Sequence, residues 1–129
     1  MAHSVNEISG IIVDAAIKVH SSLGPGLLEG VYLAVLAIEL RNRGLKVELE
    51  VPIRLEWEGQ EVGVALRADM IVEDAVIVEG KATEENAKVH LRQLRTYVKL
   101  AKLKIGLLLN FGMSLMKEGI FRHVEGLEE

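Results

Sequence analysis

The chain has 129 residues, no cysteine, a net charge of -4 at pH 7 and 50% apolar residues, which fits a single domain over residues 1–129 whose core needs no disulfide bonds. No apolar run is long enough to span a membrane, and the first residues lack the basic and apolar segments of a signal peptide, so we expect a cytoplasmic protein without membrane partners. The acidic balance excludes nucleic-acid binding through an overall positive field, but it does not exclude a local binding site.

Two helices are predicted at the start of the chain. Ser4 and Glu7 have the spacing of a capping box, and apolar residues at intervals of three and four predict a helix over residues 5–22. A second helical pattern begins after Gly26 and ends at Gly44, a residue suited to the left-handed conformation that follows many helices. A short Gly-Pro-Gly turn separates the two predicted helices.

The hydrophobic period then changes to that of β-strands. Alternating polar and apolar residues predict one strand over residues 46–57, and a hairpin turn at 58–61 leads to a second strand over 62–72. Residues 75–81 predict a third strand after a tight turn. These segments predict a sheet built largely from consecutive strands.

The last predicted elements are a helix over residues 84–103, a buried strand over 105–111 and a short closing strand over 120–124. The full order is two helices, three strands, one helix and two strands. This order predicts an α+β fold in which a central mixed sheet is flanked by helices.

Three charged residues interrupt the second and third predicted strands. Glu79 and Lys81 are two residues apart, so they point to the same face of the sheet. If the strands form a hairpin about the Glu73-Asp74 turn, Asp69 lies near Glu79, and two converging carboxylates favour a hard divalent cation such as Mg²⁺. Lys81 would then orient or deprotonate a water or neutralise a phosphate. The alternative is an edge hairpin whose charges are solvated.

Polar residues also mark the second and third predicted helices. Glu29 falls in the first turn of the second helix, where the free amides alone favour an acidic residue. On the third helix, one polar strip beside the apolar face comprises Asn86, His90, Gln93 and Tyr97. A separate basic stripe comprises Lys88, Arg92, Arg95, Lys99 and Lys102. Gln93 and Tyr97 lie at least about 120° from its centre, so one site cannot easily use both sides, and a solvated face explains the stripe well.

The run V-H-S-S-L-G-P-G-L-L-E-G-V-Y at residues 19–32 resembles the signature of the GxxExxY proteins, small prokaryotic proteins of the PD-(D/E)xK nuclease-like superfamily. Gly26, Glu29 and Tyr32 supply the naming motif. The resemblance continues through R-A-D, V-E-G-K-A, Q-L-R-T-Y and L-L-N-F-G, which begin at residues 67, 78, 93 and 108. It implies a restriction-endonuclease-like α-β-β-β-α-β core, preceded here by an additional helix.

The resemblance also implies a nuclease site. Asp69 and Glu79 would be ligands of Mg²⁺ or Mn²⁺, and Glu29 would be the extra acidic residue that the first core helix often provides. Lys81 would be the catalytic lysine. The implied reaction is metal-dependent hydrolysis of phosphodiester bonds in DNA.

Gln93 and Tyr97 match a Q-x-x-x-Y pattern of the recombination-exonuclease branch, where these residues help to hold the substrate end and the lysine. Gly80 stands where a bulky apolar residue is usual, which predicts a loosened strand. Gly80, the small size and the acidic balance favour an alternative function, a non-catalytic homo-oligomeric binding or scaffold protein. We expect a homodimer or higher oligomer in either case, because a domain this small has little room for both a catalytic cleft and a nucleic-acid-binding surface, and a symmetric dimer would double that surface.

Overall fold

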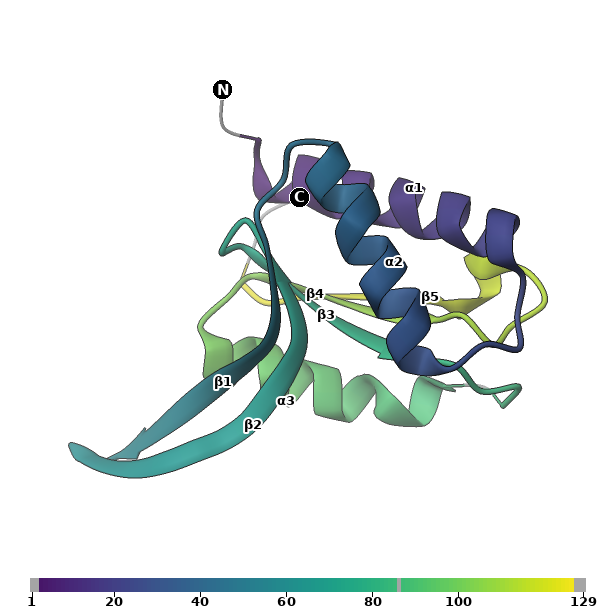
Figure 1. The fold of residues 1–129 in the computed structure, drawn as a ribbon. Coiled ribbons are helices and arrows are strands. Elements are labelled where there is room, and N and C mark those ends of the chain that lie inside the picture. Colours follow the sequence, from purple (N-terminus) through teal and green to yellow (C-terminus); the bar gives the residue numbers. More distant parts are fainter. Residues whose placement is uncertain (1–2, 86, 127–129) are drawn as a thin grey trace.

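The fold consists of helices packed on both faces of one β-sheet (Figure 1). The computed structural model describes residues 3–85 and 87–126. In chain order, the elements within these residues are α1 (Val5–Leu23), α2 (Glu29–Asn42), β1 (Val47–Trp57), β2 (Gln60–Val72), β3 (Val76–Lys81), the short 3-10 helix η1 (Ala87–His90), α3 (Leu91–Ala101), β4 (Ile105–Asn110), the 3-10 helix η2 (Met116–Gly119) and β5 (Ile120–Val124).

The sheet is mixed, and its spatial order follows the chain as β1-β2-β3-β4-β5. Neighbouring strands pair antiparallel except β3 and β4, which are parallel. A parallel pair needs a crossover connection, and α3 provides it on the face opposite α1 and α2 (Figure 1). The predicted α+β fold is therefore confirmed. The segment from α2 to β4 has the expected α-β-β-β-α-β order, with α1 as the additional helix.

Alternate residues of β3 contribute to two separate cores. Val78 belongs to the cluster that contains the buried residues of α1 and α2, whereas Ile77 belongs to a cluster with Val98 of α3. Because side chains alternate along a strand, Glu79 and Lys81 lie on the same face as Ile77. Both charged residues of β3 therefore point to the face that α3 covers.

The first predicted helix is confirmed, including its capping box. The Ser4 N–H donates to Glu7 Oε1 at 3.0 Å, and the Glu7 N–H donates to Ser4 Oγ at 3.1 Å. These reciprocal bonds satisfy two amides that the start of a helix leaves without an intrahelical partner.

The third helix is shorter than the predicted range of 84–103, which is wrong at its start. The chain forms η1 and only then the α-helix, which begins at Leu91. Val89 is exposed, so its side chain does not hold a helix against the sheet there. At the other end, Lys102 adopts a left-handed φ of 59° and terminates the helix. Asn86, predicted on its polar strip, lies outside the described residues.

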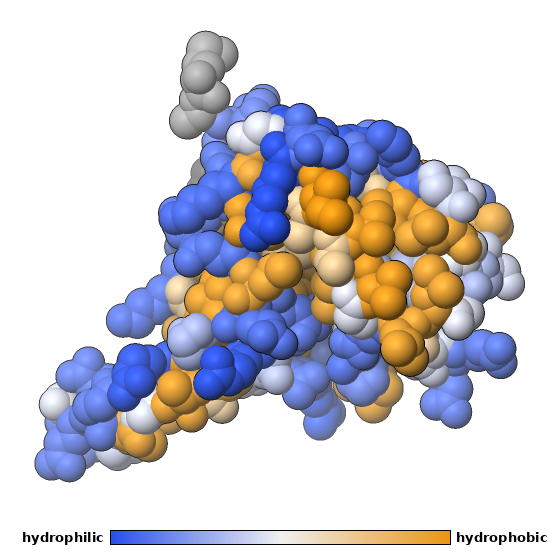
Figure 2. Space-filling view, in the orientation of Figure 1, coloured by the Kyte–Doolittle hydropathy of each residue, from blue (hydrophilic) through white to orange (hydrophobic). Residues whose placement is uncertain are grey.

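The outward side of α2 is apolar, which is unusual for a surface helix. Figure 2 shows apolar side chains gathered along α2 and over the loop that leads into it. The exposed residues in this region include Leu28, Val31 and Ile38. The inner side of the same helix packs against the core through Leu36 and other buried residues.

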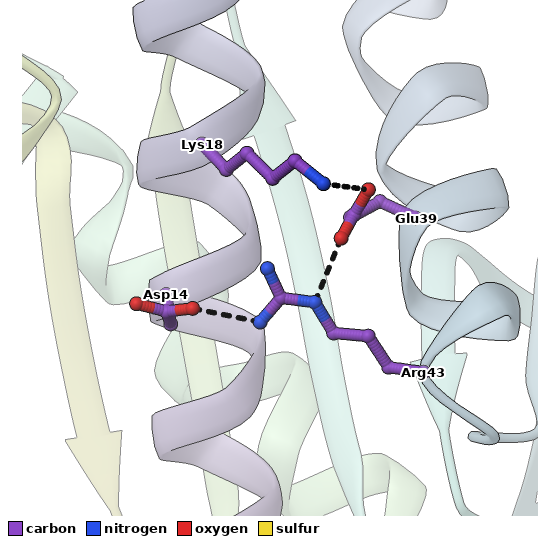
Figure 3. A network of polar contacts seen from close by, with 4 residues as sticks. All are labelled: Asp14, Lys18, Glu39 and Arg43. Carbon is purple, nitrogen blue, oxygen red and sulfur yellow. Dashed lines mark hydrogen bonds and ion pairs between the residues drawn. The ribbon is translucent and has the colours of Figure 1, made fainter.

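A network of ion pairs fastens α2 to α1 along one flank (Figure 3). Arg43 of the α2 end donates to Glu39 and to Asp14, each at 2.8 Å, and Lys18 donates to Glu39 at 3.0 Å. The network contains two basic and two acidic side chains, so it is neutral as a whole. Such surface pairs add little stability individually, but together they link the two helices at defined positions.

The close packing of α3 on β4 predicts a specific effect of adding one methyl group to Gly106. A Cβ there would lie 2.5 Å from Val98 Cγ2 and 2.9 Å from Leu94 Cδ1, and the β-branched Val98 cannot easily move within its helix. We expect Gly106→Ala to lower the free energy of unfolding by about 1–3 kcal/mol. Gly10→Ala, at a helical site with open space, should raise it by about 0.5–1 kcal/mol. Urea denaturation of both variants measures these changes, and an equal effect of the two substitutions would contradict the packing.

Candidate metal and catalytic site

The β2–β3 hairpin changes its bonding at Asp69 and Glu79. Main-chain pairing runs from Val72–Val76 to Met70–Val78, and the next residues in the register are Asp69 and Glu79. There the Asp69 N–H donates to Glu79 Oε2 at 2.8 Å, and the Gly80 N–H donates to Asp69 Oδ2 at 2.9 Å. Each carboxylate bonds the backbone of the opposite strand, so the two side chains are held against each other. The predicted proximity of Asp69 and Glu79 is confirmed.

Glu79 is buried, with only 8% of its surface exposed, and it lies in the central strand β3. Burial raises the pKa of Glu79 to about 8, although the bond from the Asp69 N–H opposes the shift. The negative charges of Asp69 and Glu29 raise this pKa further, and Lys81 lowers it. The alternative prediction, a solvated hairpin at the sheet edge, is therefore wrong.

Asp69 is half-buried, and burial also raises its pKa. The hydrogen bond from Gly80 and the positive charge of Lys81 both oppose this increase. The two paired carboxyls thus resist ionisation, because each ionised group is poorly solvated and meets other negative charges. A cation bound between them would relieve this cost.

Glu29 is the first residue of α2, and its side chain interacts electrostatically with the hairpin. Burial raises the pKa of Glu29, the charge of Asp69 raises it further, and Lys81 and His90 lower it. Lys81 therefore influences all three acidic residues of the predicted site. The fold brings Glu29, Asp69, Glu79 and Lys81 into one electrostatic cluster.

The loop before α2 is held in place by Tyr32, which is completely buried. Its hydroxyl donates to the Gly24 carbonyl at 2.5 Å and accepts the Leu27 N–H at 3.1 Å. The Tyr32 ring stacks on Phe111, with centroids 4.7 Å apart and planes 4° from parallel. Gly26 has a φ of 109°, which favours glycine. The glycine, the acid and the tyrosine of the motif thus form a fixed turn that starts the helix at Glu29.

Tyr97 and Gln93 differ in their relation to the carboxylates. Burial raises the pKa of Tyr97, and the negative charges of Glu79 and Asp69 raise it further, so the phenol lies near the site. Gln93 is exposed and makes no hydrogen bond to a described residue. The structure brings Tyr97 to the carboxylates but shows no contact between Gln93 and them.

Two residues of the basic stripe, Arg92 and Arg95, face away from the carboxylates. Arg92 and Arg95 line a hollow of about 260 Å³ together with Arg122 and His123 of β5. Since β5 is the sheet edge beyond β4, this hollow lies on the other side of the helix from Tyr97. For Arg92 and Arg95 the structure therefore agrees with the helical-wheel separation from Tyr97.

Sequence reasoning did not identify Glu50. In the β1–β2 register its neighbours pair as Leu49–Met70 and Val51–Ala68, which puts Glu50 opposite Asp69. Its negative charge raises the pKa of Asp69. Glu50 also has a left-handed φ of 50°, and with Asp69 it lines a hollow of about 190 Å³ beside α2. Only the strand register, which alternation alone does not determine, could have revealed this position.

Asn110 is a second residue that the sequence did not single out. It is completely buried at the end of β4, beside Lys81 in the parallel pair. Its Oδ1 accepts the N–H groups of Thr83 and Gly112 at 3.1 and 3.0 Å, and its Nδ2 donates to the Glu85 carbonyl at 3.2 Å. Asn110 thereby fixes the chain that directly follows Lys81.

Gly80 does not leave a hole in the core, contrary to the prediction of a loosened strand. A Cβ on Gly80 would lie 2.9 Å from Cδ2 and 3.0 Å from Cγ of Leu33. The side chain of Leu33 therefore occupies the space that a larger residue would fill. The glycine lets α2 approach β3 closely, and its N–H holds Asp69.

The donor set fits a hard divalent cation. The second oxygens of the two carboxylates, Asp69 Oδ1 and Glu79 Oε1, form no hydrogen bond to a described residue. Neither oxygen is enclosed in the core without a partner. Over 3–85 and 87–126, no cluster of three or more His, Asp or Glu side chains could hold a metal ion. Mg²⁺ is commonly bound by one or two carboxylates with water and phosphate as further ligands, so the pair is sufficient. Glu29 as a third ligand stays a prediction.

Comparison with known families agrees with this geometry. Residues 6–123 match the PD-(D/E)XK nuclease superfamily, and the chain belongs to it. No curated protein and no solved structure matches the chain. In the part of the chain that the structure describes, no helix has the length and apolar character needed to cross a membrane.

Removal of the Tyr32 hydroxyl tests the role of this residue in holding the loop. Tyr32→Phe keeps the ring that stacks on Phe111 but leaves the Leu27 N–H without its acceptor. We expect the free energy of unfolding to fall by about 1–3 kcal/mol. Tyr97→Phe is the matched control, because the Tyr97 hydroxyl bonds no described residue, and its effect should stay within about 0.5 kcal/mol. Chemical denaturation compares the two variants, and equal losses would contradict the role of Tyr32.

The raised pKa of Glu79 predicts that stability falls with increasing pH. Between pH 4.5 and about 8 the unfolded chain loses the Glu79 proton whereas the folded chain retains it, so the folded state binds more protons and becomes less stable as pH rises. Glu79→Gln removes this titration and keeps an acceptor for the Asp69 N–H. In the presence of a chelator, the variant should gain stability relative to the wild type across this range. Parallel curves of unfolding free energy against pH would show that Glu79 titrates normally.

Proposed function

We propose that the protein is a metal-dependent nuclease that hydrolyses phosphodiester bonds of DNA. The observation that carries the proposal is the reciprocal bonding of Asp69 and Glu79 in the central hairpin, with Lys81 on the same face. Membership of the PD-(D/E)XK nuclease superfamily supports it. Gly26, Glu29 and Tyr32 have the spacing of the GxxExxY proteins, and we assign the chain to that branch as part of the same proposal.

Asp69 and Glu79 would hold Mg²⁺ or Mn²⁺ through the carboxylate oxygens that the backbone leaves free. The cation would supply a bound water of lowered pKa and charge stabilisation at the phosphate. The strand backbone contributes rigidity, because the N–H groups of Asp69 and Gly80 hold the two carboxylates from opposite strands. The ligands are thus positioned before the substrate binds.

Lys81 would place its ammonium group beside the phosphate and the attacking water. Its position at the end of β3 is maintained by the Phe111 N–H, which donates to the Lys81 carbonyl at 2.8 Å, and by the Asn110 bonds that fix the following residues. A positive charge there orients the water and neutralises charge that develops on the phosphate oxygens.

Glu29 and Tyr97 would complete the site from α2 and α3. Glu29 adds a negative charge that favours cation binding, and its place depends on the turn closed by Tyr32. Tyr97 presents a phenol near the carboxylates, where it would contact the substrate or Lys81. The exposed Gln93, one turn earlier, would contact the substrate strand further from the reacting phosphate.

Single substitutions at the site test this proposal on single- and double-stranded DNA with Mn²⁺. Asp69→Asn, Glu79→Gln and Lys81→Met should each lower the cleavage rate by about 100-fold or more. Calorimetric Mn²⁺ titration should show binding lost in the two carboxylate variants and retained in Lys81→Met, which has both carboxylates.

Asp74→Asn serves as the control for a carboxylate of the same hairpin outside the site, because Asp74 pairs with Lys46 at the exposed turn. Its Mn²⁺ binding and cleavage should equal those of the wild type. Cleavage that survives Asp69→Asn would exclude the proposed site. Mn²⁺ binding without turnover of any DNA would favour the non-catalytic alternative.

A further inference from the structure

The hollow between α3 and β5 is lined mainly by basic side chains. Its volume is about 260 Å³, and its lining residues are Leu91, Arg92, Arg95, Arg122 and His123. Within the part of the chain that the structure describes, no acidic residue lines it. The Arg122 guanidinium group also donates to Asn6 Oδ1 of α1. Guanidinium groups from two elements that are distant in sequence thus surround one hollow on the surface.

The described residues do not balance this positive charge. The side chains of Arg92 and Arg95 form no ion pair with a described residue. Arg95 interacts electrostatically with Glu125, but the same carboxylate lies 2.8 Å from His123 Nε2 and also interacts with Lys99. Like charges three residues apart on a helix repel each other. An anion in the hollow would relieve this repulsion.

Phosphate is the anion that this lining suits. Guanidinium groups bind phosphate oxygens through paired, charge-assisted hydrogen bonds, which a planar fork of donors can form with little loss of entropy. The lining contains no Phe, Tyr or Trp on which a nucleic-acid base could stack. The hollow therefore fits the phosphate of a nucleic-acid backbone and not a base.

The hollow and the proposed catalytic site lie on opposite sides of one helix. Arg95 is two positions before Tyr97, which places it about 160° away around α3, and Tyr97 is near the carboxylates. A helix with its side chains is about 10–12 Å wide, whereas a specific protein–DNA interface covers about 1,000–2,500 Å² of protein. No other α-helix of the described residues lies on this face of the sheet (Figure 1). DNA at the carboxylates would therefore extend across α3 to the hollow.

We propose that Arg92, Arg95 and Arg122 bind a phosphate of the DNA backbone at a second contact, remote from the phosphate that reacts. This inference rests on the proposed function, because it takes DNA as the substrate. The contact positions the duplex without reading its sequence. It gives a protein with a net charge of -4 the local positive surface that DNA binding requires.

The proposal is tested by the binding of a short fluorescent DNA duplex, measured by anisotropy with a chelator present so that no cleavage occurs. Arg92→Gln and Arg95→Gln should each weaken binding about tenfold, because each removes charge-assisted hydrogen bonds. In the double variant, the plot of log association constant against log salt concentration should be less steep by about 0.9, the change for one lost phosphate contact. Both positions are exposed, and circular dichroism should show the fold retained.

Lys117→Gln is the matched control, because it removes the same charge from an exposed residue that lines a hollow with Ile17 and His20 of α1. It should leave the affinity and the salt dependence unchanged. The variant with lysine at both arginine positions should retain the wild-type salt dependence, since it keeps the two charges. Equal weakening by Lys117→Gln would overturn the site, because total charge would then explain the binding.

The outcomes separate this contact from the nuclease function. A wild type that cleaves DNA, together with arginine variants that bind the duplex as tightly as the wild type, would overturn the second contact and leave the catalytic proposal standing. Binding that depends on the arginines, without cleavage in Mg²⁺ or Mn²⁺, would support the contact and count against the nuclease. A wild type that binds no DNA would overturn the contact.

Discussion

The arrangement of this protein depends on the exchange of hydrogen bonds between Asp69 and Glu79. The regular β2–β3 ladder ends at Met70 and Val78, and beyond it each carboxylate accepts the backbone N–H of the opposite strand. The exchange fixes the buried Glu79 and the half-buried Asp69 beside each other, at the cost of poor solvation of both charges. The raised pKa of Glu79 expresses that cost. A cation bound between the two carboxylates would remove this cost, and the proposed metal site rests on that argument.

The rest of the fold positions this hairpin and completes its surroundings. Leu33 packs against Gly80 and holds α2 close to β3, while Tyr32 fixes the turn from which Glu29 starts. On the other face, Gly106 allows α3 to lie tightly on β4, which brings Tyr97 toward the carboxylates. Asn110 then fixes the segment after Lys81. The contacts of Leu33 with Gly80 and of Asn110 with Thr83 join segments that are distant in sequence.

Short-range patterns in the sequence made part of the fold and of the site predictable. The capping box at Ser4, the change of hydrophobic period and the two-residue spacing of Glu79 and Lys81 are short-range signals, and the elements they predict are confirmed. The start of α3 was not predictable in this way, because the segment before Leu91 has helical composition, yet its Val89 is exposed and the chain forms a 3-10 turn there. Glu50 and the space filled by Leu33 depend on strand register and helix approach, which no local pattern contains.

The most direct test of the account is the titration of the Glu79 carboxyl group by carbon-detected NMR, with and without Mg²⁺. If Asp69 and Glu79 form a metal site, the pKa of Glu79 should be about 8 in the metal-free protein and should decrease strongly when Mg²⁺ is added, because the cation stabilises the ionised form. Asp69→Asn should abolish the response to Mg²⁺. A pKa near the ordinary value of 4.5, or a raised pKa that Mg²⁺ does not change, would contradict the assignment of Asp69 and Glu79 as a metal site.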